Sequence, residues 1–348
     1  MNVDEYLRRI PKVELHNHVT GAVRLDTVIE LSKKNGIPLP TSDPNALYEY
    51  SDLIGFLTSH TAVCNTLRDR DDFARVAYEC LEDGYTSSNV RYMEIFFNPT
   101  NHMAEGVPYA TVVDGLVDGI RRARDEFGIR AQLIPSINRQ ESVAVAQTML
   151  DAMAEYRHDE VIGIGMDHDE LPHPPEKFAG IYQAAGDAGF RRTAHTSHDG
   201  PGSYITTCLD LLGCDRIDHG YNVLSDAEAL KRVVDEQIAF TCAISSVQAF
   251  WMVPASDDPG APLYNRIAGM VESGVNVTLH TDDATMLHTD LSSEYKKFCD
   301  EFSQDPSRAR DVSLAALDAC WLDDSEKAAL RSEFETDFAS LGAELASS

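Results

Sequence analysis

The sequence predicts a single α/β domain folded as a (β/α)8 barrel, and three observations favour this fold. Short β-rich runs alternate with amphipathic helical segments along nearly the whole chain. There are eight such runs, and no glycine-rich phosphate-binding turn follows the first of them, as a doubly wound sheet would favour. Polar residues gather where the runs end. In a barrel these ends meet on one face, which is the face that carries active sites.

The predicted strands are rich in β-branched and aromatic residues, and apolar residues recur at helical spacing between them. The strands are predicted at Val13–His18, Val90–Phe97, Ile129–Ile137, Val161–His168, Arg191–Ser197, Arg216–Tyr221, Ile238–Ser245 and Val275–Asp283. The clearest helical segments are Tyr109–Phe127, Ser142–Tyr156, Pro175–Ala188 and Asp226–Glu236. Alternation of this kind requires a parallel sheet with crossover helices.

Two stretches fall outside the regular repeat. Residues from about 47 to 84, between the first two strands, are predicted to form a helical insertion over the barrel mouth. Residues from about 292 to 348, rich in Ala, Leu and Glu towards the end, are predicted to be C-terminal helices. Because no linker, repeat or low-complexity tract interrupts the chain, we expect residues 1–348 to form one domain.

The charge balance is strongly acidic, with 57 Asp and Glu against 29 Lys and Arg and a formal net charge of -28. A field of this sign repels phosphate backbones and anionic lipid surfaces, so we expect no nucleic-acid or membrane partner and a small-molecule substrate instead. A solvated acidic surface accounts for the charge, and steering of a cationic substrate is the alternative interpretation.

The cysteines indicate a reducing compartment. The seven cysteines are odd in number, scattered, and never form a Cys-x-x-Cys pair, so the sequence predicts neither a disulfide framework nor a thiolate zinc site. No uncharged apolar run approaches the roughly 20 residues that span a bilayer. We therefore expect a cytoplasmic protein.

Histidines and aspartates at the predicted strand ends form the candidate site. His16 and His18 are two residues apart on the first strand, which places both imidazoles on one face of the pleat. The other strand-end residues are His195, His219, Asp282 and Asp283. Three histidines and a carboxylate are nitrogen and oxygen ligands suited to a divalent ion of the zinc class, although iron or manganese would also be accepted.

Five strings carry a family resemblance. PKVELHNHVTGAVR, VRYMEIFFNP, AHTSHDG, RIDHGYNVL and TLHTDDA follow one another from Ile10 to Thr289. They resemble, in order, the strand-end motifs of the adenosine deaminase branch of the amidohydrolase superfamily. The resemblance implies a (β/α)8 barrel that holds one zinc ion through its metal ligands. It implies that these ligands are His16, His18, His195 and Asp282, with catalytic roles for His219 and Asp283.

The implied chemistry is hydrolytic deamination. A bound metal lowers the pKa of its water towards neutrality, and the resulting hydroxide would attack an sp2 carbon and expel an amine. In this scheme His219 deprotonates or orients the water, and Asp283 accepts a hydrogen bond from the attacking hydroxyl. The leading hypothesis is a deaminase of an amino-substituted heterocycle, such as a purine or modified nucleoside.

One departure from the family concerns the general acid. Members of this kind carry His-Ala-Gly-Glu after the fifth strand, and the glutamate protonates a purine ring nitrogen, whereas this chain has His195-Thr196-Ser197-His198. His198 is a candidate general acid or base, since histidine titrates near neutral pH. A substrate-recognition role and a purely structural role are the alternatives. Asp199 would supply the lost carboxylate only if the loop were displaced by one residue.

Two further departures concern substrate contacts. His168 stands where the family has a glycine whose N–H approaches the purine, so it either fills space or contacts the ligand. Asp169, beside it, is a further candidate for substrate contact. Thr20 stands where many adenosine-specific relatives place an aspartate that binds the sugar 5′-hydroxyl.

All of these departures affect substrate recognition, and none affects the metal set. Ordinary adenosine is therefore a doubtful substrate. A metal-dependent hydrolase of a cyclic amide, amidine or ester, which releases no ammonia, is the alternative function. A catalytically inactive binding protein that keeps the barrel is the third.

Overall fold

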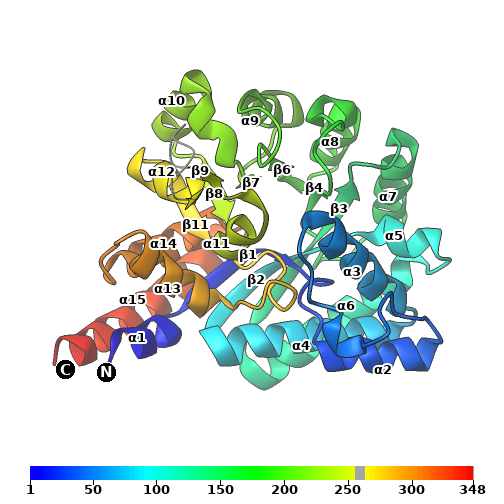
Figure 1. Cartoon of the computed structure of the whole chain (residues 1–348), viewed down its shortest axis with the longest axis horizontal. Coiled ribbons are helices and arrows are strands. Elements are labelled where there is room, and N and C mark those ends of the chain that lie inside the picture. The colour runs from blue at the N-terminus through cyan, green and yellow to red at the C-terminus, as the bar shows by residue number, and fades with distance from the viewer. Residues whose placement is uncertain (255–262, 348) are drawn as a thin grey trace.

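The computed structural model describes residues 1–254 and 263–347, and it confirms the predicted barrel (Figure 1). The barrel strands are β1 (Lys12–His18), β2 (Val90–Phe97), β3 (Arg130–Asn138), β4 (Gly163–Asp167), β5 (Arg191–Arg192), β6 (His195–Thr196), β7 (Ile217–His219), β8 (Ala239–Cys242) and β11 (Asn276–Leu279). Every barrel pairing is parallel, as crossover connections require.

The strand order closes on itself. One sheet runs β1-β2-β3-β4-β5 and the other β11-β8-β7-β6. The predicted fifth strand is split, because β5 pairs with β4 whereas β6 pairs with β7. The remaining seam lies between β1 and the residues after β11. There the His18 N–H donates to the Asp282 carbonyl, and the Asp282 N–H donates to the His16 carbonyl, each over 2.8 Å.

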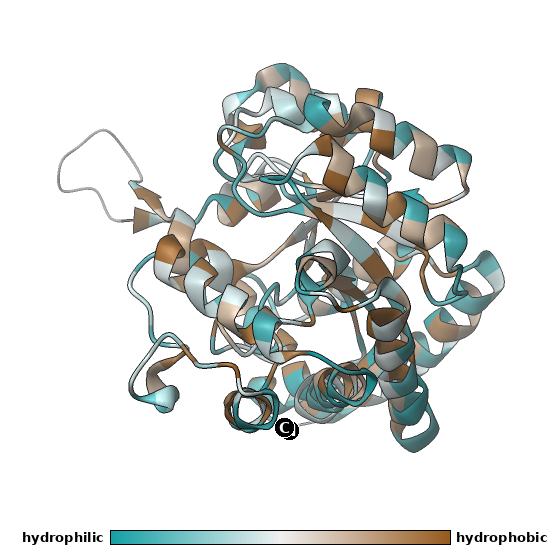
Figure 2. Ribbon diagram, turned by 90° about the vertical axis from the view of Figure 1, so that its right-hand side faces the viewer, coloured by the Kyte–Doolittle hydropathy of each residue, from teal (hydrophilic) through white to brown (hydrophobic). Residues whose placement is uncertain are grey.

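Helices surround the strands, as Figure 2 shows from the side. The long ones are α2 (Leu25–Asn35), α3 (Leu53–Thr66), α4 (Arg70–Ser88), α6 (Tyr109–Phe127), α7 (Val143–Glu155), α8 (Ala179–Asp187), α10 (Ala227–Asp235), α13 (Leu291–Glu301), α14 (Arg308–Ala319) and α15 (Asp324–Ala346). The short ones are α1 (Val3–Arg9), α5 (Pro99–Ala104), α9 (Ser203–Thr207), α11 (Ile244–Ser246) and α12 (Arg266–Glu272). In the part of the chain that the structure describes, no helix combines the length and apolarity that crossing a membrane needs.

The helix ends follow from local capping. Ser142 and Asp226, which begin two of the predicted segments, are N-caps whose side chains accept backbone N–H groups of the first turn. The predicted segments therefore exceed α7 and α10 by one capping residue at each end. After β8, the short strands β9 (Val253–Pro254) and β10 (Leu263–Tyr264) pair antiparallel and lie at the edge of the molecule in Figure 2.

The residues between β1 and β2 divide into two structural parts. Helix α3 crosses the front of the barrel in Figure 1, whereas α4 lies on the outside and packs against α6. This packing is close because α6 presents glycines to α4: a Cβ atom on Gly119 would lie 2.3 Å from the carbonyl oxygen of Ala74. The chain termini meet elsewhere, where α1 and α15 lie side by side and Arg9 pairs with Glu344 over 2.7 Å.

The α4–α6 contact gives a stability test. Replacing Gly119 by alanine should lower the free energy of unfolding by about 1–3 kcal/mol, because the added methyl group overpacks a backbone-to-backbone contact. The matched control is Gly180→Ala in α8, where a Cβ atom would meet nothing within 4 Å. That change should raise stability by up to about 1 kcal/mol through helix propensity. Urea denaturation measures both, and equal effects of the two substitutions would contradict the packing described.

Candidate active site

Four strand-end residues have left-handed backbone conformations. The φ angles are 70° at His168, 53° at Ser197, 66° at His219 and 60° at Asp282. Non-glycine residues rarely adopt such angles, and those that do cluster at sites where the surrounding structure holds them in place. The chain thus turns sharply at the carboxyl ends of β4, β6 and β7 and after β11.

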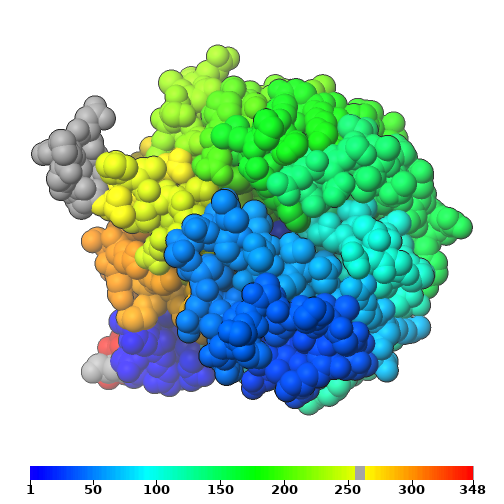
Figure 3. Space-filling view, turned by 45° about the vertical axis from the view of Figure 1, so that its right-hand side comes forward, coloured from blue at the N-terminus to red at the C-terminus, as the bar shows by residue number. Residues whose placement is uncertain are grey.

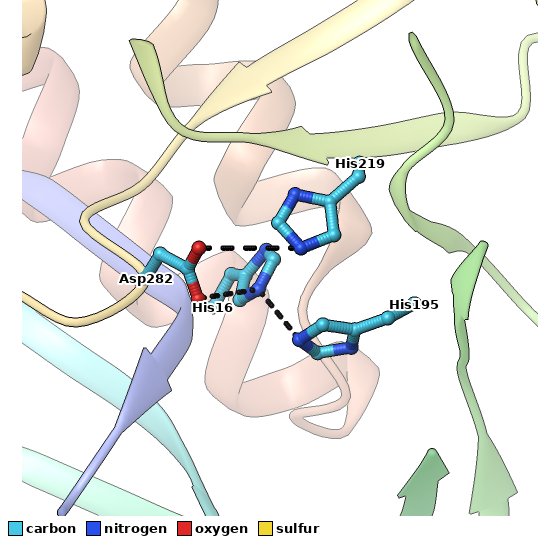
Figure 4. Close-up of side chains that lie close together, drawn as sticks. All are labelled: His16, His195, His219 and Asp282. Atoms are coloured by element: carbon cyan, nitrogen blue, oxygen red, sulfur yellow. Dashed lines mark hydrogen bonds and ion pairs between the residues drawn. The ribbon is translucent and has the colours of Figure 1, made fainter. Parts of the chain in front are cut away.

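The four residues that the family resemblance implies as ligands converge at this face. His195 Nε2 lies 3.0 Å from His16 Nε2 and 2.9 Å from His18 Nε2. Asp282 Oδ1 lies 3.3 Å from His16 Nε2 and 3.4 Å from His18 Nε2. Figure 4 shows His16, His195, His219 and Asp282 pointing towards one another, with ligand atoms within 4.8 Å.

The tautomers of two of these histidines follow from their other ring nitrogens. His16 Nδ1 lies 3.0 Å from the carbonyl oxygen of Thr241, which can only accept, so Nδ1 carries the proton. His195 Nδ1 lies 3.3 Å from Asp218 Oδ2, and the carboxylate again favours a proton on Nδ1. In the neutral form of both rings Nε2 therefore presents a lone pair.

Two lone pairs 3.0 Å apart repel each other unless a cation lies between them. The donor atoms are imidazole nitrogens and a carboxylate oxygen, and their separations suit ligands about 2.0–2.2 Å from a shared ion. The site therefore fits one divalent metal ion of the zinc class. Asp218 behind His195, and Ser246, whose hydroxyl donates to Asp282 Oδ2, hold the donors in place.

Burial and neighbouring charge set the protonation of the site. Burial lowers the pKa of His18 to about 3 and that of His219 well below its usual range, so both imidazoles are neutral at neutral pH. Burial opposes the charged form of His16 too, but the adjacent Asp282 carboxylate outweighs it and raises the pKa of His16 to about 9. A proton and a metal ion therefore compete for His16.

His219 lies beside the donors, and a contact with Tyr221 holds its Nδ1 atom in place. Its Nδ1 lies 2.8 Å from the Tyr221 hydroxyl, and that hydroxyl lies 3.5 Å from the carbonyl oxygen of Ala243. A tyrosine that donates to the carbonyl accepts from His219 Nδ1, which leaves His219 Nε2 as a base. This Nε2 lies 4.0 Å from Asp282 Oδ2.

Asp283 is buried with an oxygen that has no hydrogen-bond partner. Asp283 Oδ1 is unpaired, and burial together with the neighbouring Asp282 raises the pKa of Asp283 well above its usual range. The side chain fits only because residue 21 is glycine: a Cβ atom there would lie 1.8 Å from Asp283 Oδ1. An unpaired buried oxygen beside the metal donors is suited to contact a ligand.

A pocket opens above these residues, and Figure 3 shows a hollow beside α3 on this face. Its walls combine the site residues with apolar side chains of α3 and of the turn at Val247–Trp251. The lining residues are His18, Leu53, Phe56, Leu57, His60, Asn98, Asp167, His168, Asp169, His195, His198, Asp199, His219, Ser246, Phe250, Trp251, Asp282 and Asp283. Among the described residues that line it there is no lysine or arginine.

The candidate substrate residues differ in their placement. His168 and Asp169 line the pocket. His168 Nδ1 lies 2.6 Å from Asp167 Oδ1, and its left-handed φ explains why a glycine also suits this position. Thr20 is buried, at 3% exposure, and is not among the described residues that line the pocket.

His198 lines the pocket, and the loop that carries it is held by Glu170. This buried carboxylate accepts the backbone N–H groups of Ser197, Asp199 and Gly200 over 2.6, 3.1 and 2.7 Å. Asp199 lines the pocket too, so both candidates for the general acid reach it. Its Oδ2 atom lies 3.1 Å from His198 Nδ1.

Several residues of the site were not singled out from the sequence. Asp167 and Asp218 each directly precede a strand-end histidine, and this Asp-His repetition was the available signal. Asp167 lies 3.8 Å from His18 Nδ1 and accepts two bonds from Asn98. Trp251 and Phe250 belong to the π-helical turn Val247–Trp251 after β8, where the sequence carries no periodic pattern.

The family assignment rests on sequence comparison over nearly the whole chain. The adenosine deaminase family model matches residues 11–337. The chain belongs to the adenosine deaminase family. Its curated relatives include the adenine deaminases of Cupriavidus taiwanensis, 32% identical over 95% of this chain and 93% of that protein, and of Streptomyces coelicolor, 33% identical over 92% and 93%. The predicted resemblance is thus confirmed, and the chain is a hydrolase that acts on carbon–nitrogen bonds.

Solved structures of the family agree with the fold. An amidohydrolase from Burkholderia ambifaria with bound zinc superposes with a TM-score of 0.91 at 34% identity, over 99% of this chain and 95% of that one. The adenine deaminase of Arthrobacter aurescens superposes with a TM-score of 0.86 at 30% identity, over 94% and 98%. The zinc in the first of these accords with the donor set of this adenosine deaminase family member.

Competition at His16 makes metal binding depend on pH. The pKa of His16 is raised to about 9, so below that pH zinc must displace a proton, and affinity should rise about tenfold per pH unit as pH approaches 9. Competition with a chromophoric chelator, corrected for the chelator's own titration, measures this slope. A zinc affinity independent of pH between 6 and 9 would contradict the assignment.

Proposed function

We propose that the chain is a zinc-dependent hydrolytic deaminase of a free aminopurine, with adenine as the first candidate. One observation carries the proposal. A cluster of candidate metal donors lies together with Asp283 and His219 at the base of a pocket that aromatic side chains line. The similarity to adenine deaminases supports the substrate class. The metal, held by His16, His18, His195 and Asp282, would supply a Lewis acid and lower the pKa of its water.

The chain's own residues would position the water and carry its protons. His219 Nε2 is the base that takes a proton from the water, and the Nδ1 contact with Tyr221 keeps that lone pair available. Asp283 Oδ1 orients the attacking oxygen towards one face of the substrate ring, since no protein group occupies it. His198 acts on the ring nitrogen next to the reacting carbon.

The pocket favours a neutral base over a phosphorylated nucleotide. Its walls carry five carboxylates, at Asp167, Asp169, Asp199, Asp282 and Asp283, and no lysine or arginine among the described lining residues. A phosphate group would enter among these acidic side chains with no lysine or arginine to bind it. The rings of Phe250 and Trp251 supply flat apolar surface of the kind on which a purine stacks.

Ammonia release tests the proposal directly. The zinc-loaded protein should release ammonia from adenine faster than from adenosine and should release none from AMP, and His219→Ala should lower kcat by about 10²–10⁴-fold. Mass spectrometry should show the amine replaced by a carbonyl. A product heavier by one water, formed without ammonia, would favour the alternative function, a hydrolase of cyclic amides, amidines or esters. No turnover of any substrate would favour a catalytically inactive homologue.

The close approach of residue 21 to Asp283 gives a second test. Gly21→Ala should lower kcat by about 10²-fold, because a misplacement of Asp283 of about 1 Å disturbs alignment at the reacting carbon. Zinc content should remain unchanged, since the three atoms nearest to an added Cβ all belong to Asp283, which is not a proposed ligand. Gly180→Ala serves as the control with an unobstructed methyl group. Full activity of Gly21→Ala would show that Asp283 has no part in the reaction.

A further inference from the structure

The His198 imidazole is held firmly although it lines the pocket. Its ring lies 5.0 Å from that of Trp251 and 5.3 Å from that of His219. Its carbonyl oxygen accepts from Arg266 Nη2 over 3.2 Å and from Asn222 Nδ2 over 3.4 Å. The residue is only 6% exposed. A side chain packed in this way is preorganised for a contact at its free edge.

Two carboxylates lie near His198 Nδ1, but only one of them is available to it. Glu170 Oε2 is 3.7 Å away, and Glu170 already accepts bonds from three backbone N–H groups and from the Thr196 hydroxyl. Asp199 Oδ2 is 3.1 Å away, within hydrogen-bond distance. Asp199 is thus the direct partner of His198, and Glu170 holds the loop that presents both.

Asp199 is held in its charged form. The hydrogen bond from His198 lowers the pKa of Asp199, with further contributions from a Trp251 hydrogen bond and the Arg266 charge. A carboxylate on Nδ1 fixes which ring nitrogen points away from it and stabilises the imidazolium form. The nitrogen left for a substrate is His198 Nε2.

We propose that His198 and Asp199 form a carboxylate–imidazole pair that protonates the substrate ring, with His198 as the catalytic acid and Asp199 as its positioning residue. This inference rests on the proposed function. As the water oxygen bonds to the amine-bearing carbon, the C=N electron pair moves to the ring nitrogen, which takes the Nε2 proton of His198. The proton stays on that nitrogen in the lactam product. One water proton leaves with the amine as ammonia, and the other returns through solvent to His198.

The pair replaces a single carboxylic acid by two residues with separate tasks. A lone glutamate must hold its own proton to act as an acid, whereas here the imidazolium carries the proton and the carboxylate keeps its charge. The groups that face His198 are Glu170 and Asp199 from their loops, His219 from β7, and Arg266 from α12.

A double-mutant cycle tests whether Asp199 acts through His198 or independently of it. We expect His198→Ala to lower kcat on adenine by about 10²–10⁴-fold, with a smaller change in KM. Asp199→Asn should lower kcat by about tenfold or more, and the double variant should be no slower than His198→Ala alone. The exposed Asp187→Asn, on α8, serves as the carboxylate-to-amide control. If Asp199→Asn lowers kcat by the same factor in the wild type and in His198→Ala, the proposed pairing is overturned.

Two further readouts exclude a merely structural effect. The alkaline limb of the pH–kcat profile should move to lower pH in Asp199→Asn, because the imidazolium loses its adjacent negative charge. Histidine-selective ¹⁵N NMR, with His198→Ala as the assignment control, should show the same shift without any substrate. If the wild type releases no ammonia, the proposed function fails while the NMR titration still tests the pair. An unchanged His198 titration in Asp199→Asn would overturn the pair itself.

Discussion

The site depends on one electrostatic constraint: buried imidazole lone pairs that face each other at about hydrogen-bond distance. His16 and His195 are 3.0 Å apart at Nε2, and each has an acceptor near Nδ1, the Thr241 carbonyl oxygen for His16 and Asp218 Oδ2, 3.3 Å away, for His195. Without a proton or a metal ion between them, such an arrangement is repulsive. Thr241 and Asp218 fix the orientations of these two rings, so the repulsion between the lone pairs is relieved only when the rings share a cation.

The same residues close the barrel. The seam between β1 and the segment after β11 consists of backbone hydrogen bonds that join Asp282 to His16 and His18. The side chains of these three residues are the metal donors that we propose, so the backbone bonds that complete the sheet would also fix the relative positions of the ligands. Buried carboxyl groups, including those of Asp167, Asp218 and Asp283, surround them, and a bound divalent ion would offset part of their negative charge.

The fold could be predicted from sequence because it depends on local patterns, whereas the ligand set was proposed from strand-end positions together with the family resemblance. Eight β-rich runs with helical segments between them define a barrel, and polar residues at strand ends identify its active face. The groups behind the donors could not be predicted in this way, because their role depends on side-chain packing across the barrel. Asp218 and Asp167 look like ordinary strand residues until the pairing of β6 with β7 and the position of His18 are known.

The residues around the pocket were the hardest to place from the sequence. Thr20 lies close in sequence to His16 and His18, yet it is buried and does not line the pocket, because the chain turns away after β1. Trp251 ends the π-helical turn Val247–Trp251, which no periodic pattern reveals, yet its ring lies 5.0 Å from that of His198. The partnership of Asp199 with His198 depends on the rotation of two adjacent side chains within a loop held by Glu170, and sequence spacing does not specify that rotation.

Titration of zinc into the metal-free protein, with ammonia release from adenine followed at each addition, tests the central claim most directly. The account predicts that the rate rises linearly and stops rising at one zinc ion per chain, because one cluster of donors binds the single ion on which the reaction depends. Activity in the metal-free protein that zinc does not change, or a rate that saturates only at two ions per chain, would contradict it.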